Sequence, residues 1–166
     1  MKLLCFSVGS WNGTGSQPMR AGVGYSDEES AEVAATQATE LALERAAVNW
    51  ADLAVVFATT NYWAEYPRLL GAVQATSGAR SPVGCSGMGV LTSDGEFEGH
   101  PGIAVLVVTS DAVRARPFLV PTTTPETLSS GLTIRRLIEP LPEGPRLLVL
   151  LPDPFSDPMP QLLIRQ

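Results

Sequence analysis

The chain alternates between segments of helical periodicity and short apolar runs typical of strands. Helical spacing is clearest after Ser26, where small apolar residues recur every three or four positions up to about Val48. Ser26 and Glu29 also match a capping box, which predicts that the helix begins there. The stripe is mostly alanine, so we expect this helix to pack closely against a sheet. Its members are Ala31, Ala34, Ala35, Ala38, Leu41, Ala42 and Ala46.

Strand signals occupy much of the remaining chain. Apolar runs without alternation, as at 52–60 and 103–109, indicate strands that are buried on both faces. An Asp-Gly turn at Asp94 predicts a hairpin. The predicted strands are 21–25, 52–60, 83–86, 90–97 with its turn at 93–95, 103–109, 113–120 and 146–151, and further helices are predicted at 65–76, 126–139 and from 159. This order predicts an α/β or α+β fold, with helices packed on a mixed sheet in a single layered domain.

The first twenty residues differ from the rest. A Gly/Ser/Asn-rich stretch follows Val8, so residues 1–20 are predicted to be an extension, with residues 1–9 as a possible extra strand. Met19 is an alternative start of the protein. The regular domain is predicted to cover residues 21–166.

Composition and charge narrow the function classes. The 166 residues suit one compact domain, and the net charge is -6. Arg135 and Arg136 are the only adjacent basic residues, so the sequence argues against nucleic acid and anionic membrane surfaces as partners. No apolar run is long enough for membrane insertion, and a secretory leader is not expected. With two cysteines, Cys5 and Cys85, a reduced cytoplasmic protein is the simpler interpretation.

Most residues with a candidate functional role lie between Pro82 and Val108. A small-residue stretch there suggests a sharp turn or a close backbone approach. Glu96 and Glu98, spaced by two on an extended segment, point to one face. No metal site is expected, because one histidine and no clustered ligands fit no usual set. The small-residue stretch consists of Gly84, Cys85, Ser86, Gly87 and Gly89.

Each candidate has a simpler alternative. Cys85 is a possible nucleophile with His100 as its base, but a small buried residue in a tight turn is the favoured interpretation. The glycine-rich stretch matches no phosphate-binding pattern and favours a structural bend. The glutamates either bind a cation or the amine of a ligand, or form a solvated hairpin edge. Four residues after a buried strand either line a pocket or pack in the core, and these are Asn61, Tyr62, Trp63 and Tyr66.

Four segments in order carry a resemblance to a known family. They are WADLAVVFATT, VGCSGMGV, DGEFEGHPGIAVLVV and LLVLLPDPFS. From about residue 21 onward the chain resembles the N-terminal part of the FIST domain family. The resemblance implies a sensory domain for small ligands, such as amino acids, in a signalling protein. It also implies that the chain is incomplete relative to the family.

These observations give one preferred function and two alternatives. The preferred function is non-enzymatic sensing of a small polar molecule in intracellular signal transduction, with no cofactor, an unidentified downstream partner and possible homo-oligomers. The alternatives are a thiol-dependent hydrolase or transferase that uses Cys85, and a protein-interaction module. The predicted ligand-binding residues are Gly84, Cys85, Ser86, Gly87, Glu96, Glu98, Asn61 and Tyr62.

Overall fold

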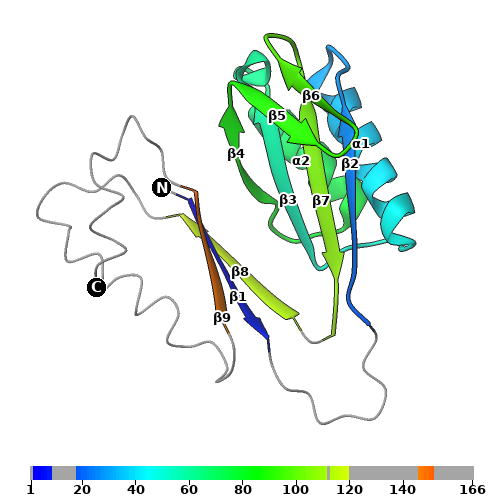
Figure 1. Ribbon diagram of the computed structural model, residues 1–166, viewed down its shortest axis with the longest axis vertical. Helices are drawn as coiled ribbons and strands as arrows, with labels where there is room; N and C mark the ends of the chain where they lie inside the picture. The colour runs from blue at the N-terminus through cyan, green and yellow to red at the C-terminus, as the bar shows by residue number, and fades with distance from the viewer. Residues whose placement is uncertain (1, 9–17, 112, 120–145, 152–166) are drawn as a thin grey trace, which may run out of the picture. The chain divides into compact units, whose positions relative to one another are not determined.

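The structure, a computed structural model, describes residues 2–8, 18–111, 113–119 and 146–151 (Figure 1). The described residues belong to two compact units, one of residues 15–111 and one that combines residues 1–14 with 112–166. The helices predicted at 126–139 and from 159 lie outside the described residues. The elements are β1 (Lys2–Val8), β2 (Arg20–Ser26), α1 (Ala31–Ala46), β3 (Leu53–Thr59), η1 (Thr60–Tyr62), α2 (Tyr66–Ser77), β4 (Val83–Gly87), β5 (Gly89–Thr92), β6 (Gly95–Glu98), β7 (Ile103–Thr109), β8 (Val113–Leu119) and β9 (Arg146–Leu151).

The larger unit is built on a four-stranded sheet in the order β2-β7-β3-β4. β7 is antiparallel to both β2 and β3, whereas β3 and β4 run parallel. A parallel pair needs a crossover connection, and α2 supplies it between β3 and β4. The sheet is therefore mixed and carries helices, which confirms the predicted fold class.

Helix α1 packs very closely on β2. A side chain at Gly22 would overlap the backbone oxygen of Ala42, and one at Gly24 would overlap that of Ala38. The helix presents a stripe of alanines to the strand, so the two backbones approach with almost no side-chain volume between them. This confirms the close contact that the alanine pattern predicts. The buried apolar residues of α1 are Ala31, Ala34, Ala35, Ala38, Ala42, Leu43 and Ala46.

The two faces of the sheet have different covers. Alternate residues of the two central strands pack under the helices, together with Leu69 and Val73 of α2. On the opposite face, Val90 and Phe97 of the β5-β6 hairpin pack against Ala104 and Tyr25. Figure 1 shows the hairpin crossing in front of the sheet, with the helices behind it. The sheet residues on the helix side are Ala54, Val56, Ala58, Ile103, Val105 and Val107.

The beginning of α1 differs from the prediction. Ser26 does not cap the helix, because it still belongs to β2 and its hydroxyl donates to Gln37 Oε1 at 2.8 Å. Its oxygen also accepts a bond from the Glu28 N–H at 3.4 Å, which forms a turn between strand and helix. The helix begins four residues later, with Ser30 as its N-cap residue. The capping-box prediction was wrong because a local turn competes for the same serine.

The smaller unit contains a three-stranded antiparallel sheet in the order β8-β1-β9. β1 lies within the first nine residues, where the sequence suggests an extra strand. It lies in the centre, between β8 and β9, which come from the other end of the chain. Among the described strands of this sheet β8 lies at an edge, where Pro117 is tolerated.

The α1–β2 contact makes a direct stability prediction. Gly24→Ala places a methyl group against the Ala38 carbonyl oxygen, and we expect unfolding free energy to fall by about 1–3 kcal/mol. Urea denaturation measures the change. Gly71→Ala in α2 is the matched control, because its added methyl group meets nothing within 4 Å. Equal effects of the two substitutions would show that the close contact is unimportant.

A second prediction concerns the end of α1. Ala47 closes the helix with φ 53° and ψ 48°, a left-handed conformation that strains residues with a Cβ. Ala47→Gly removes this strain, so we expect a gain in stability of about 1 kcal/mol or less. Thermal unfolding compares it with Glu44→Gly, which lies inside the helix and should cost about 1 kcal/mol. A destabilised Ala47→Gly variant would contradict the assignment.

Candidate functional site

The glycine-rich stretch is a strand for most of its length. Gly84, Cys85, Ser86 and Gly87 all lie in β4, and the turn that the sequence predicts begins only after them. A side chain at Gly84 would overlap the Val56 carbonyl oxygen, so this glycine allows β4 to approach β3. The stretch is therefore explained by close backbone approach. Along it, burial decreases from Gly84, which is buried, to Ser86, which is exposed.

Strand register brings several predicted site residues to one edge of the sheet. Gly87, at the end of β4, pairs with Thr59 at the end of β3. Gly89, two residues later, pairs with Glu98 of β6. Asn61 follows β3 in η1 and is exposed. The carboxyl ends of the parallel strands thus lie beside a carboxylate-bearing strand, and we refer to this region as the β3-β4 edge.

A buried threonine fixes the geometry of this edge. Thr59 is fully buried, and its N–H donates to the Gly102 carbonyl oxygen at 2.8 Å. The Gly102 N–H donates in return to Thr59 Oγ1 at 3.0 Å. The Tyr66 hydroxyl donates to the Thr59 carbonyl oxygen at 3.2 Å. These bonds hold the end of β3, the start of β7 and the start of α2 together.

Tyr62 is placed in the core beside the edge. Its ring is 2% exposed, and its hydroxyl donates to the Glu28 carbonyl oxygen at 2.5 Å. Burial raises the pKa of the phenol to about 12, and the negative charges of Asp27 and Glu28 add to the shift. The hydroxyl joins η1 to the loop before α1, so we assign Tyr62 a structural role. Trp63, the next residue, is 75% exposed.

The glutamate pair lies on the outer side of the hairpin. Glu96 and Glu98 are both exposed, while Phe97 between them is buried, as strand alternation requires. Glu96 pairs with Leu91, which is 77% exposed. Within the described residues, neither glutamate has an ion-pair partner. Glu98 therefore lies at the β3-β4 edge, whereas Glu96 lies farther along toward the hairpin turn.

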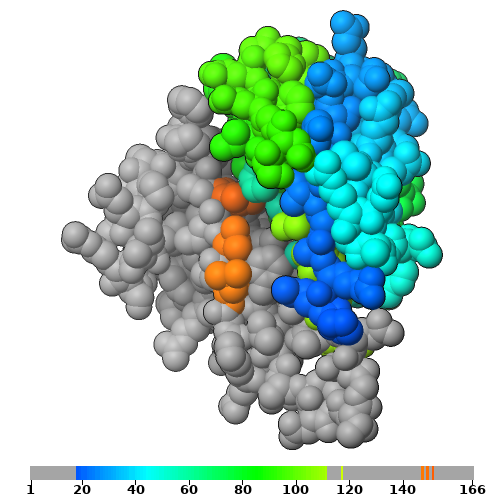
Figure 2. Space-filling view, turned by 45° about the vertical axis from the view of Figure 1, so that its right-hand side comes forward, coloured from blue at the N-terminus to red at the C-terminus, as the bar shows by residue number. Residues whose placement is uncertain are grey.

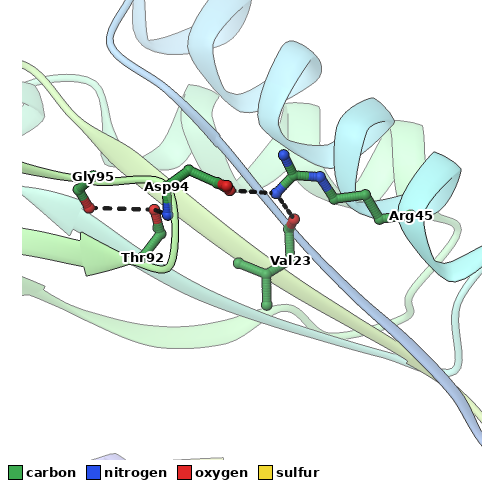
Figure 3. A network of polar contacts seen from close by, with 5 residues as sticks. All are labelled: Val23, Arg45, Thr92, Asp94 and Gly95. Carbon is green, nitrogen blue, oxygen red and sulfur yellow. Dashed lines mark hydrogen bonds and ion pairs between the residues drawn. The ribbon is translucent and has the colours of Figure 1, made fainter.

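An arginine that the sequence analysis did not single out holds the hairpin in place (Figure 3). Arg45 Nη1 donates to Asp94 Oδ2 at 2.6 Å and to the Val23 carbonyl oxygen at 3.0 Å. Its guanidinium also lies 5.6 Å from the centre of the Tyr25 ring. The bond to Asp94 raises the arginine pKa. We call the Arg45–Asp94 pair with its bond to Val23 the edge clamp.

The thiol alternative involves Cys85 and His100. The ring of His100 contacts its own neighbours, with Nδ1 2.9 Å from the Pro101 carbonyl oxygen and an edge contact to Phe97. Cys85 is half-buried in β4. Across the part of the chain that the structure describes, no three His, Cys, Asp or Glu side chains could together hold a metal ion. No helix in the same residues is long and apolar enough to cross a bilayer.

Comparison with known families agrees with this arrangement. The FIST N domain profile matches residues 52–165, which is more than half of the chain. The chain belongs to the FIST N domain family. The match begins at β3 and includes β4, the hairpin and β7, so the β3-β4 edge lies within it. FIST domains are domains of a sensory type, which agrees with the resemblance in the sequence.

Two curated relatives extend the similarity toward the N-terminus. Both are uncharacterized proteins of Mycobacterium tuberculosis, from strains CDC 1551 / Oshkosh and H37Rv, and each is 29% identical over 140 residues. The alignment covers 84% of this chain but 35% of each relative. The chain thus spans about a third of the length of these relatives.

The role of Tyr62 predicts a specific pH dependence. Its pKa is raised from 10.0 to about 12 in the folded state, so its contribution to stability is complete below pH 10. As the pH rises from 10 to 12, the unfolded state loses this proton first, and stability falls. We expect Tyr62→Phe to weaken this part of the pH dependence and to cost about 0.5–1.5 kcal/mol at pH 7 through the lost hydrogen bond.

Denaturation at pH 7, 10 and 11.5 measures both effects. Tyr66→Phe is the matched control, because its hydroxyl is also bonded to a backbone oxygen. If Tyr62→Phe keeps the full decline of stability above pH 10, the hydroxyl does not have the environment described.

Proposed function

We propose that the chain binds a small polar molecule that carries an amine, such as an amino acid, at the β3-β4 edge. The observation that carries the proposal is the pair of strand registers that bring Gly87 beside Thr59 and Gly89 beside Glu98. These registers bring Glu98 to the carboxyl ends of two parallel strands. Within the described residues, the Glu98 carboxylate has no ion-pair partner. In open α/β sheets, ligands bind at such strand ends.

The residues of the edge have complementary chemistry. Glu98 supplies a negative charge for an amine, and charged hydrogen bonds of this kind are strong. Ser86 and Asn61 are exposed and supply neutral donors and acceptors for the rest of the ligand. Gly87 and Gly89 leave the backbone accessible, because no side chain covers it. Glu96 belongs to the proposal as a second negative charge that attracts the ligand.

The proposed role is sensing rather than catalysis. Cys85 is half-buried in β4, among small residues, and we interpret it as a structural residue rather than a nucleophile. We propose a signalling role in the cytoplasm, which rests on the family and on the low cysteine content. The ligand is then the input, and a separate partner receives the signal.

A ligand screen tests the proposal. The protein is titrated calorimetrically with single amino acids and simple amines, and we expect at least one to bind. Glu98→Gln removes the charge but keeps the shape, so the dissociation constant of that ligand should rise about ten- to hundredfold. Glu96→Gln should have a smaller effect, because Glu96 lies farther from the edge.

Glu40→Gln is the matched control, since it removes an exposed carboxylate from α1. It changes the net charge by the same amount and should leave the affinity unchanged. The proposal fails if no compound binds, or if Glu98→Gln and Glu40→Gln behave alike.

A further inference from the structure

The outer edge of β2 presents backbone groups that are not used by the sheet. In an antiparallel strand, the N–H and C=O of one residue point to the same side, and neighbours alternate. The Val23 carbonyl oxygen faces Arg45 rather than β7. The backbone groups of Ala21, Val23 and Tyr25 therefore all point outward from the sheet. Within the described residues, the Arg45 bond to Val23 is the single hydrogen bond to this set of groups.

This edge is accessible at Ala21 and Val23, whereas Tyr25 is half-buried. Ala21 is exposed and Val23 is 36% exposed. Figure 2 shows the blue residues of β2 at the surface, between the cyan helix α1 and the green hairpin. An open edge of this kind is a template for an added strand unless a charged group blocks it. The edge clamp blocks the β2 edge at Val23, because the Arg45 guanidinium is hydrogen-bonded to the Val23 carbonyl oxygen.

We propose that the β2 edge accepts a single extended segment of a partner protein, and that the edge clamp controls its entry. When Arg45 leaves Val23, the segment pairs with the outward groups of Ala21, Val23 and Tyr25. The proposal concerns a different surface from the β3-β4 edge and does not depend on ligand binding there.

The position of α1 favours an isolated extended segment, rather than a second copy of the chain, as the added strand. Paired strands lie about 4.8 Å apart, whereas a helix with its side chains is about 10–12 Å wide. Because α1 packs directly on Gly22 and Gly24, two copies joined through β2 would bring their α1 helices into collision. An isolated segment carries no such helix. It does need small residues on the side that faces α1.

Charge adds a second requirement on the segment. Displacement of Arg45 leaves the Asp94 carboxylate without its partner, on a chain of net charge -6. A segment with a basic residue is therefore favoured over an acidic one. The partner chemistry is an extended, small-residue segment with apolar residues on the outer side and a basic residue.

A peptide with the sequence of residues 20–26, RAGVGYS, meets these requirements and serves as the probe. The peptide pairs antiparallel to β2 with its valine opposite Val23. Its alanine, valine and tyrosine then form hydrogen bonds with every outward backbone group of β2. Its two glycines face α1. Binding is followed by NMR through the amide signals of Ala21, Val23 and Tyr25, with the peptide at millimolar concentration.

We expect Arg45→Gln to bind the peptide about two- to tenfold more tightly than the unmodified protein, because one more backbone hydrogen bond becomes available. Asp94→Asn, which weakens the clamp without removing Arg45, should give a smaller gain. Arg68→Gln removes an exposed arginine from α2 and should give none.

Two modified peptides test the register. N-methylation of the peptide valine removes a proton that faces β2 and should abolish binding, whereas N-methylation of the following glycine should be tolerated. The proposal is overturned if Arg45→Gln shows no shift of the three amide signals, if both methylated peptides bind alike, or if Arg68→Gln matches Arg45→Gln.

Discussion

The close contact between α1 and β2 is the constraint on which the larger unit depends. Gly22 and Gly24 have no side chains, and α1 faces them with alanine, so helix and strand backbones almost touch. This contact keeps α1 over the edge strand of the sheet. From there Arg45, in the last turn of the helix, reaches around the strand to the Val23 carbonyl oxygen and to Asp94. Larger residues at either glycine would move the helix outward and break the edge clamp.

The hairpin connects this packing to the proposed site. Phe97 and Val90 anchor it on the sheet, and Asp94 ties its turn to α1. With both ends held, Glu98 keeps its register beside Gly89 at the β3-β4 edge. The other side of that edge is fixed by the reciprocal hydrogen bonds of Thr59 and Gly102. The larger unit thus combines hydrogen-bonded strand ends with exposed polar groups, as the proposed sensing of a small molecule requires.

Local patterns predicted most of the described elements, because they depend on the period of apolar residues. The alanine stripe of α1 and the apolar runs of β3 and β7 needed no knowledge of distant residues. Ser26 shows where local rules fail, since its hydroxyl bonds to Gln37 instead of capping α1. The strand predicted at 83–86 agrees with β4, which continues to Gly87, and Gly84 allows its close approach to Val56.

Only part of the candidate site could be predicted from the sequence. The register that pairs Gly89 with Glu98 follows from the local hairpin turn, whereas the position of the hairpin at the ends of β3 and β4 is a tertiary property that no single segment encodes. The edge clamp joins Arg45 and Asp94, which are 49 positions apart, and the Asp-Gly turn gave no sign of an arginine partner. Tyr62 was grouped with ligand-binding residues because it follows a buried strand. Burial of its ring, and the bond of its hydroxyl to Glu28, depend on the loop before α1.

The most direct test of the proposed sensory site is an amide NMR map of the protein titrated with single amino acids. The account predicts that the largest shifts, for the amino acid that binds, occur at Gly87, Gly89 and Glu98, with smaller ones at Asn61. The amides of α1 should be unaffected. Shifts centred on another part of the chain, or no shifts with any amino acid, would contradict it.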